Sequence, residues 1–225
     1  MFDIFLQIDS TGMAKALAVQ KESVMGILVK GGVLMIPLAL LFALAVFFFI
    51  ERLIAIRKAS KIEDNFMSII RDHVVTGNIT AARSLAKNTA NPVARMIDKG
   101  LQRIGKPIDA IERSMDNVGK LEIYKMEKNL NILSVISRIA PIFGFIGTII
   151  GMIILLREFA SLASPSISEI ADAMYVKLIT SVFGLGIGIL SYAGYSYLNS
   201  QIDRTVNKME ASSAEFIDIL QEPTK

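Results

Sequence analysis

Three long stretches without a charged residue constrain this chain more than any other feature of its sequence. Residues 31–50, 139–156 and 178–202 are 20, 18 and 25 residues long and contain no Asp, Glu, Lys or Arg. A hydrocarbon core about 30 Å thick needs about 20 helical residues. The alternation that a membrane-spanning strand requires is absent from all three stretches. The sequence therefore predicts an all-α membrane protein with transmembrane helices at 32–54, 132–157 and 174–198.

The basic residues predict how the chain is oriented in the membrane. Residues 52–131 hold 15 of the 24 Lys and Arg residues, the first 31 residues hold three, and residues 158–173 hold none. The excess of Lys and Arg in cytoplasmic loops places 52–131 inside the cell. The N-terminus is then outside the cell and the C-terminus inside it. Residues 1–31 would be an outer segment with an amphipathic surface helix near 13–30, and 158–173 would be a short outer hairpin.

The cytoplasmic parts, residues 55–131 and 199–225, read as helical. Asn91-Pro92 is typical of a helix start, whereas Gly77-Asn78 and Gly105-Lys106-Pro107 predict breaks. We expect a helix from 108 to 131 that runs directly into the second span. We expect the third helix to continue to Leu220, so that long helices two and three extend into a cytoplasmic helical bundle.

Composition excludes several classes of function. The chain has no cysteine, which rules out thiolate nucleophiles, disulfides and cysteine–zinc sites. Its single histidine, His73, has no partner in the sequence with which to form a metal or catalytic site. The net charge of +3 gives no support for nucleic-acid binding. We expect no metal, no cofactor, no catalytic residue and no enzymatic activity.

The second and third spans each carry a stripe of small and polar residues at helical spacing. The stripe of the second span consists of Ser134, Ser137, Pro141, Gly144, Thr148 and Gly151. The stripe of the third span consists of Lys177, Ser181, Gly184, Gly188, Ser191 and Tyr195. Gly147 with Gly151, and Gly184 with Gly188, also match the small-xxx-small pattern through which membrane helices approach closely.

Two explanations of these stripes stay open at this stage. Close helix packing alone explains the glycines, and a lone hydroxyl can bond to its own helix. Hydroxyls on matching stripes of two helices also suit a shared, partly wet surface. Thr148 and Ser181 would lie at similar depth in the membrane, and Thr180 beside Ser181 could share its role. Lys177 sits near a helix end, where its charge can reach the membrane surface.

The apolar cores of the spans contain no carboxylate, although proton relays in membranes use ionisable groups. If the stripes line a proton pathway, another chain must supply the titrating group.

The stretch "RIAPIFGFIGTIIGMI", followed after a short hairpin by "KLITSVFGLGIGIL", resembles the MotA/TolQ/ExbB proton-channel family. The segment "TGNITAARSLAKNTANPVARMIDKGL" is also similar, more loosely. Three spans resemble the ExbB and TolQ branch, because the flagellar stator branch has four. In that family, a second span with Pro, Gly and Thr and a third span with Thr line an energised pore.

The resemblance implies a homopentamer in the bacterial inner membrane, around single-span ExbD-like or TolR-like helices that carry a membrane aspartate. A TonB-like or TolA-like protein would transmit the motion to the outer membrane. By position, Thr148 matches the second-span threonine, and Ser181 matches the third-span threonine. Val176 stands where many relatives have a glutamate, so the charge at the pore mouth differs here. A structural scaffold whose stripes serve packing only is the alternative reading.

The predicted topology can be tested with reporter fusions. A reporter inserted near Gly105 or fused after Lys225 should be cytoplasmic, and one near Ser164 should be external, because the basic residues stay on the inner side. Alkaline phosphatase and green fluorescent protein fusions distinguish the two sides. A cytoplasmic reporter at Ser164 would contradict the orientation.

Overall fold

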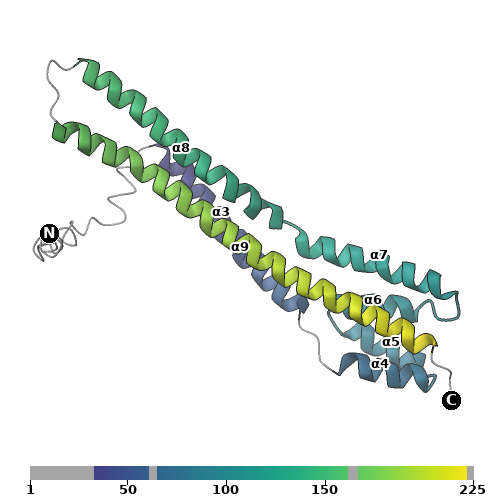
Figure 1. The fold of residues 1–225 in the computed structure, drawn as a ribbon. Helices are drawn as coiled ribbons and strands as arrows, with labels where there is room; N and C mark the ends of the chain where they lie inside the picture. The colour runs from purple at the N-terminus through teal and green to yellow at the C-terminus, as the bar shows by residue number, and fades with distance from the viewer. Residues whose placement is uncertain (1–32, 61–64, 162–166, 222–225) are drawn as a thin grey trace, which may run out of the picture. The chain divides into compact units, whose positions relative to one another are not determined.

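The computed structural model describes residues 33–60, 65–161 and 167–221, and every regular element within these ranges is an α-helix. The helices are α3 (Met35–Ser60), α4 (Phe66–Val75), α5 (Ile79–Asn88), α6 (Pro92–Leu101), α7 (Ile108–Glu127), α8 (Leu130–Ser161) and α9 (Ile167–Gln221), shown in Figure 1. Three stretches are long and apolar enough to cross a membrane: Met35–Ser60, Ile108–Arg157 and Lys177–Gln221. The predicted all-α fold with three candidate spans is confirmed. The segment 1–31 with its expected surface helix lies outside the described residues.

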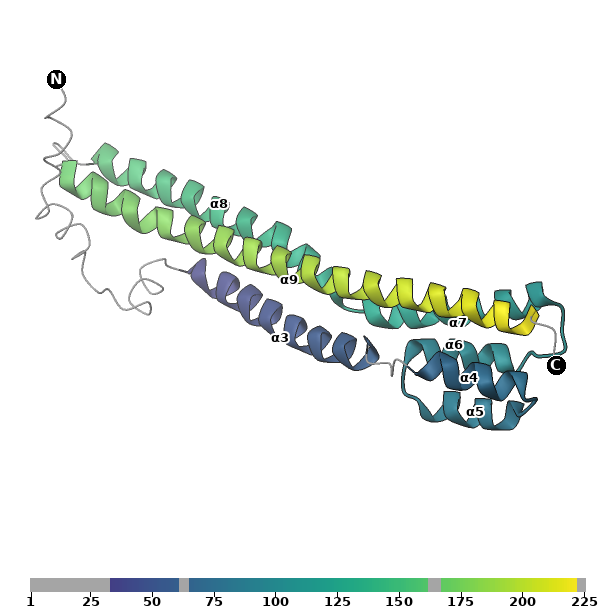
Figure 2. The same ribbon diagram turned by 60° about the horizontal axis from the view of Figure 1, so that its bottom comes forward.

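The chain divides into two compact units, which we describe separately. The first contains Ile142–Leu185 together with the first turns of α3, up to Ala39. In it, parts of α8 and α9 run side by side in opposite directions (Figures 1 and 2). The second unit comprises Leu40–Pro141 and Gly186–Lys225, and it holds α4 to α7 with the remaining parts of α3, α8 and α9.

Local sequence signals account for the boundaries of the short helices. The Asn91 side chain accepts a hydrogen bond from Val93 N at 2.8 Å, and Pro92 opens α6, as predicted from this dipeptide. Gly77 and Gly105 have φ angles of 73° and 91°, a region that glycine enters without strain. The two predicted breaks therefore separate α4 from α5 and α6 from α7.

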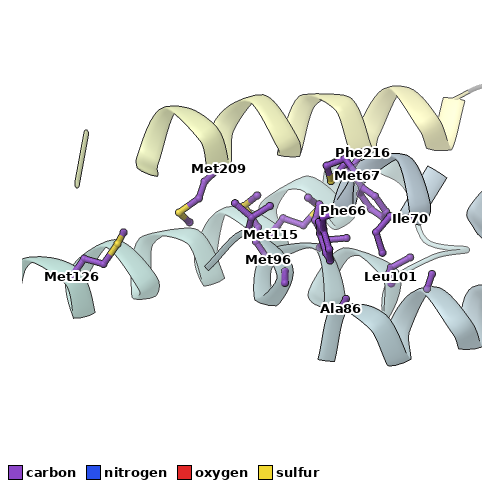
Figure 3. Close-up of a cluster of buried hydrophobic side chains, with 14 of the residues drawn as sticks. Phe66, Met67, Ile70, Ala86, Met96, Leu101, Met115, Met126, Met209 and Phe216 are labelled. Atoms are coloured by element: carbon purple, nitrogen blue, oxygen red, sulfur yellow. The ribbon is translucent and has the colours of Figure 1, made fainter. Parts of the chain in front are cut away.

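The second unit is built around an apolar core between α4, α5, α6, α7 and α9. Figure 3 shows Met115 of α7, Met96 of α6 and Phe216 of α9 converging, and all three are almost fully buried. A Cβ added to Gly100 of α6 would lie 2.6 Å from Met115 Sδ and from Phe216 Cε1. Ile56 of α3 and Ile202 of α9 belong to the same core. The continuation of α9 beyond Asn199, as expected from the sequence, supplies one wall of this core.

The expected continuous helix from 108 into the second span is wrong. Helix α7 ends at Glu127, and α8 begins at Leu130. Lys128 has extended backbone angles (φ −51°, ψ 133°), and Asn129 has φ 64°. Asparagine is one of the few residues that tolerate this left-handed conformation. Because neither of these two polar residues is Pro or Gly, no strong signal of a break is present in the sequence.

Two clusters of charged side chains lie inside the second unit. Glu122 of α7 is buried, and it accepts hydrogen bonds from Arg95 Nη1 at 2.7 Å and from Lys125 Nζ at 2.6 Å. Arg52 of α3 is also buried, pairs with Glu51, and donates a hydrogen bond to Lys125 O at 3.3 Å. The bond from Arg52 to Lys125 O links the basic end of α3 to α7, and the bond from Arg95 to Glu122 links α6 to α7.

The left-handed residue between α7 and α8 provides a test of the joint. Replacing Asn129 with valine forces a β-branched side chain into this conformation and should destabilise the protein by about 1–2 kcal/mol. Asn129→Gly should destabilise the protein less than Asn129→Val, because it removes the hydrogen bond to Glu51 but leaves the backbone unstrained. The midpoint of thermal unfolding of the detergent-solubilised protein, followed by circular dichroism, measures both effects.

The matched control is Asn131→Val, two residues later in α8, where the side chain is exposed and the backbone is helical. It should change the midpoint much less than Asn129→Val. Equal midpoints for the two valine variants would contradict the break.

Candidate functional site

The centre of the candidate site is a contact between the α8 and α9 backbones in the first unit. Gly144 of α8 is buried, and a Cβ added there would lie 3.0 Å from Thr180 O and 3.1 Å from Gly184 Cα. Contacts this short to backbone atoms leave no space for a Cβ unless the facing helix shifts by a few tenths of an ångström. Gly144 and Gly184, both predicted as packing residues, therefore meet face to face.

Two further glycines of α8, Gly147 and Gly151, also contact α9. We call the α8 and α9 surfaces that touch at these glycines the packed face. Gly147 lies against the side chain of Thr180, with an added Cβ 2.9 Å from Thr180 Cγ2. Gly151 lies against the aliphatic stem of Lys177, with an added Cβ 2.7 Å from Lys177 Cγ. Gly151 thus leaves space for the aliphatic stem of Lys177, the residue predicted to carry the charge at the pore mouth. This pairing could not be read from either stripe alone.

The hydroxyls of Thr148 and Ser181 lie beside the packed face rather than in it. Both side chains are half-buried, whereas Gly144 and Gly184 are buried. At about 100° per residue, Thr148 is turned about 40° from Gly144, and Ser181 about 60° in the same sense from Gly184. The two helices are antiparallel, because positions that advance along α8 contact positions that go back along α9. The contacts are Gly144 with Gly184, Gly147 with Thr180, and Gly151 with Lys177. Equal senses of rotation on facing antiparallel helices place both hydroxyls on the same flank.

Hydrogen bonding fixes the direction in which the Thr148 hydroxyl points. Its Oγ1 donates to Phe145 O at 2.7 Å, the ordinary local bond of a helical threonine. A hydroxyl oxygen has two lone pairs as well as its proton. With the proton held by the helix, the oxygen remains an acceptor for water or for a protonated group beside the flank.

Thr180 and Ser181, between which the sequence could not choose, occupy different environments. Thr180 is only 3% exposed and lies in the packed face against Gly147. Ser181 is half-buried on the flank that also holds Thr148. The geometry gives Thr180 a packing position and leaves Ser181 accessible.

The remaining stripe residues lie in the second unit. A Cβ added to Gly188 would lie 2.6 Å from Pro141 Cγ and 3.0 Å from Ser137 O, so Gly188 and Pro141 form a close contact. The Ser137 hydroxyl donates to Ser134 O at 2.8 Å, and Arg138 Nε donates to the same carbonyl at 3.2 Å. Ser191 is 4% exposed, and its hydroxyl has no hydrogen-bond partner among the described residues.

The buried charges were not predicted from the sequence. Arg52 is one of the basic residues that indicate the orientation, and no pattern singles out Glu122. Among the described residues, Glu51 Oε2 and Arg52 Nε are buried without a hydrogen-bond partner. The adjacent acid–base pair at the end of an apolar run was a signal, but a surface location is the usual one for such charges. No group of three or more potential metal ligands occurs in the part of the chain that the structure describes.

These features define a multi-pass helical membrane protein in which glycine packing holds two hydroxyl-bearing spans together. The chain matches the MotA/TolQ/ExbB proton channel family over residues 88–211, more than half of its length. It therefore belongs to the MotA/TolQ/ExbB proton channel family.

Individual relatives carry ExbB names. A protein of Methanothermobacter thermautotrophicus named as an ExbB homolog in biopolymer transport is 28% identical over 162 residues, which cover 72% of this chain and 57% of that protein. The biopolymer transport protein exbB1 of Vibrio cholerae is 31% identical over 88 residues, 39% of each chain. An ExbB-like protein of Synechocystis is 25% identical over 200 residues, 86% of this chain and 77% of that protein. The aligned region spans only 57% and 39% of the length of the first two relatives.

The backbone contact at Gly144 can be tested by adding one methyl group. Gly144→Ala should lower the unfolding midpoint, since overpacking costs about 1–3 kcal/mol and exceeds the gain in helix propensity of about 1 kcal/mol. The measurement is the thermal stability of the purified protein in detergent, monitored by size-exclusion chromatography.

Gly186→Ala is the matched control, because nothing lies within 4 Å of a Cβ added to Gly186 in the helix α9. It should leave the midpoint unchanged or raise it slightly. A Gly144→Ala protein as stable as Gly186→Ala would show that the two backbones do not touch.

Proposed function

We propose that this chain is an ExbB/TolQ-like subunit of a proton-driven motor in the bacterial inner membrane. Five copies would surround single-span ExbD/TolR-like helices, and proton flow would energise a TonB/TolA-like process at the outer membrane. The observation that carries the proposal is the shared flank: Thr148 and Ser181 are half-buried on one side of a helix pair fixed by Gly144. Membership of a proton channel family and relatives named for biopolymer transport support it.

In this proposal the hydroxyls orient a proton that belongs to another chain. The apolar cores at 139–156 and 178–202 contain no carboxylate, and hydroxyls do not titrate near neutral pH. The Thr148 oxygen is free to accept, because its proton is bonded to Phe145 O. It suits a protonated carboxyl donor on a partner helix. A membrane aspartate of the partner would therefore complete the pathway.

The proposed roles of the other residues follow from their positions. Ser134 and Ser137, which are partly exposed, would add hydroxyls to the pathway, whereas Ser191 is 4% exposed and would not be accessible to it. Lys177 would set the charge at the pore mouth, with its stem lying on Gly151. Pro141, Gly144, Gly147, Gly151, Gly184 and Gly188 would hold the helices at the required distance. Ser181 rather than Thr180 would face the pathway, since Thr180 is buried in the packed face.

The proposed orientation has the N-terminus in the periplasm and residues 52–131 in the cytoplasm, supported by the 15 basic residues of that segment. We infer that the chain is not an enzyme, because the family to which it belongs is a family of proton channels. A structural scaffold remains the competing function. It explains the glycines equally well but assigns no role to the accessible hydroxyls.

Proton flux in vesicles distinguishes the two functions. One charge crossing 100 mV releases about 2.3 kcal/mol, enough to drive motion when passage is coupled to it. The chain alone should conduct few protons, and the chain reconstituted with a single-span partner carrying a membrane aspartate should conduct more. Thr148→Val and Ser181→Ala should each lower this flux, because each removes an oxygen acceptor from the flank. A pH-sensitive dye inside the vesicles measures the flux.

Thr180→Val is the matched control, because it removes a hydroxyl from the packed face while keeping the shape of the side chain. It should leave both flux and assembly intact. Full flux from the chain alone, or undiminished flux in a Thr148→Val and Ser181→Ala double variant, would favour the scaffold.

A further inference from the structure

An apolar groove in the second unit lies between α3 and α9, and neither Thr148 nor Ser181 lines it. Its volume is about 580 Å³, within the range of small-molecule sites of about 300–1,000 Å³. Its walls include Phe42, Phe49 and Ile50 of α3, Leu133 of α8, and Leu190 and Tyr197 of α9. Gly194 lies at the base, where an added Cβ would be 2.9 Å from Phe49 Cδ2. The absent side chain at Gly194 lets Phe49 lie directly on α9.

The groove has the length and opening that suit a lipid chain. From Phe42 to Ile50 the helix rises about 12 Å, most of one leaflet of a hydrocarbon core about 30 Å thick. Phe42 is 45% exposed, Ile50 49% and Leu190 64%, so the walls face outward from the helices. These residues belong to apolar runs of membrane length. An occupant from the surrounding bilayer can therefore enter from the side.

A second, smaller pocket shares Tyr197 with the groove, and several of its lining side chains carry hydrogen-bonding groups. It has a volume of about 290 Å³ and is lined by Leu53, Ile56, Arg57, Ser60, Tyr197 and Gln201. Arg57 follows Ile50 by seven residues, two helical turns along the same face of α3. The apolar groove thus leads to a cluster of hydrogen-bond donors.

The chemistry of this pocket favours an anion. Arg57, Tyr197 and Gln201 can each donate hydrogen bonds, and no acidic residue lines the pocket. Arg57 is exposed and forms no ion pair with any residue in the described ranges. Its planar guanidinium matches the oxygens of a phosphate group.

We propose that the groove between α3 and α9 binds one acyl chain of an anionic phospholipid, whose phosphate is held by Arg57 with Tyr197 and Gln201. The groove accommodates the chain within the leaflet on the Arg57 side, and the donor side chains of the smaller pocket select a negatively charged headgroup. A bound lipid at this place would fasten the basic half of α3 to α9. The site is separate from the flank that carries Thr148 and Ser181.

Native mass spectrometry of the intact, detergent-solubilised protein tests the site directly. After removal of bound lipid, equal amounts of phosphatidylglycerol and phosphatidylcholine are added, and the lipid retained per chain is measured. The unaltered protein should retain phosphatidylglycerol preferentially. Arg57→Gln should reduce that retention about fivefold, as expected for loss of an exposed charge-assisted contact of about 1 kcal/mol. No preference in the unaltered protein would overturn the proposal.

Lys58→Gln is the matched charge control. Lys58 is the next residue of α3 and is also exposed, but it lines a different cavity that contains Glu122. It should retain phosphatidylglycerol as the unaltered protein does. Equal losses of phosphatidylglycerol retention in Arg57→Gln and Lys58→Gln would show that general surface charge causes the retention. That result would overturn the proposal.

Two further variants test the apolar part. Ala193→Phe, at an exposed position of the groove wall, should fill the groove and remove retention of the lipid. Ser191→Ala should not change retention, because an acyl chain needs no hydroxyl. Unchanged retention in Ala193→Phe places the lipid elsewhere, and loss in Ser191→Ala points to a polar occupant. If Ala193→Phe changes the number of chains per complex, the groove binds a second copy of the chain and not a lipid. Each of these three outcomes overturns the proposal.

Discussion

The contact between the backbones of α8 and α9 at Gly144 is the interaction on which the candidate site depends. Inside a bilayer, burial of apolar surface does not drive helices together, because lipid is as apolar as a leucine side chain. Close packing must supply that stabilisation, and it needs backbones that can touch. The spacing of 3.0 Å from an added Cβ to Thr180 O leaves glycine as the residue that fits. The two flanking hydroxyls keep a fixed relation because the helices beneath them cannot move apart or rotate freely.

The same helix α9 serves two different environments, and its sequence changes accordingly. In the first unit its buried positions include Thr180 and Gly184, which allow close approach, beside Ile179. Near its C-terminal end they include large residues such as Met209 and Phe216, which fill a core with the short helices. In water, burying an aromatic or Met side chain contributes about 1.5–3 kcal/mol, a gain that is not available within lipid.

Much of this arrangement could be predicted from residue spacing. Three charge-free runs, the Asn91-Pro92 start and the glycine breaks gave the spans and the short helices, because each signal is local. The left-handed Asn129 was missed, since asparagine is also common in helices and loops. The positions of Thr180 and Ser181 could not be separated either. Adjacent residues differ by about 100° on a helix, and only the partner helix decides which one is buried. The lysine stem over Gly151 likewise depends on a contact between two helices.

The separation of packing glycines from accessible hydroxyls has a consequence for the proposed motor. A titratable group within the glycine face would have to be desolvated at a place where Gly144 leaves no space for a side chain or for water. Such a charge is costly in the membrane without a partner. Hydroxyls on the flank avoid this cost, since they stay neutral and bond to their own helix when nothing else is present. In the proposed assembly, a complete proton path forms only when the partner helix places its carboxyl beside Thr148 and Ser181. Conduction then depends on assembly, and the subunit alone does not dissipate the gradient that the complex uses.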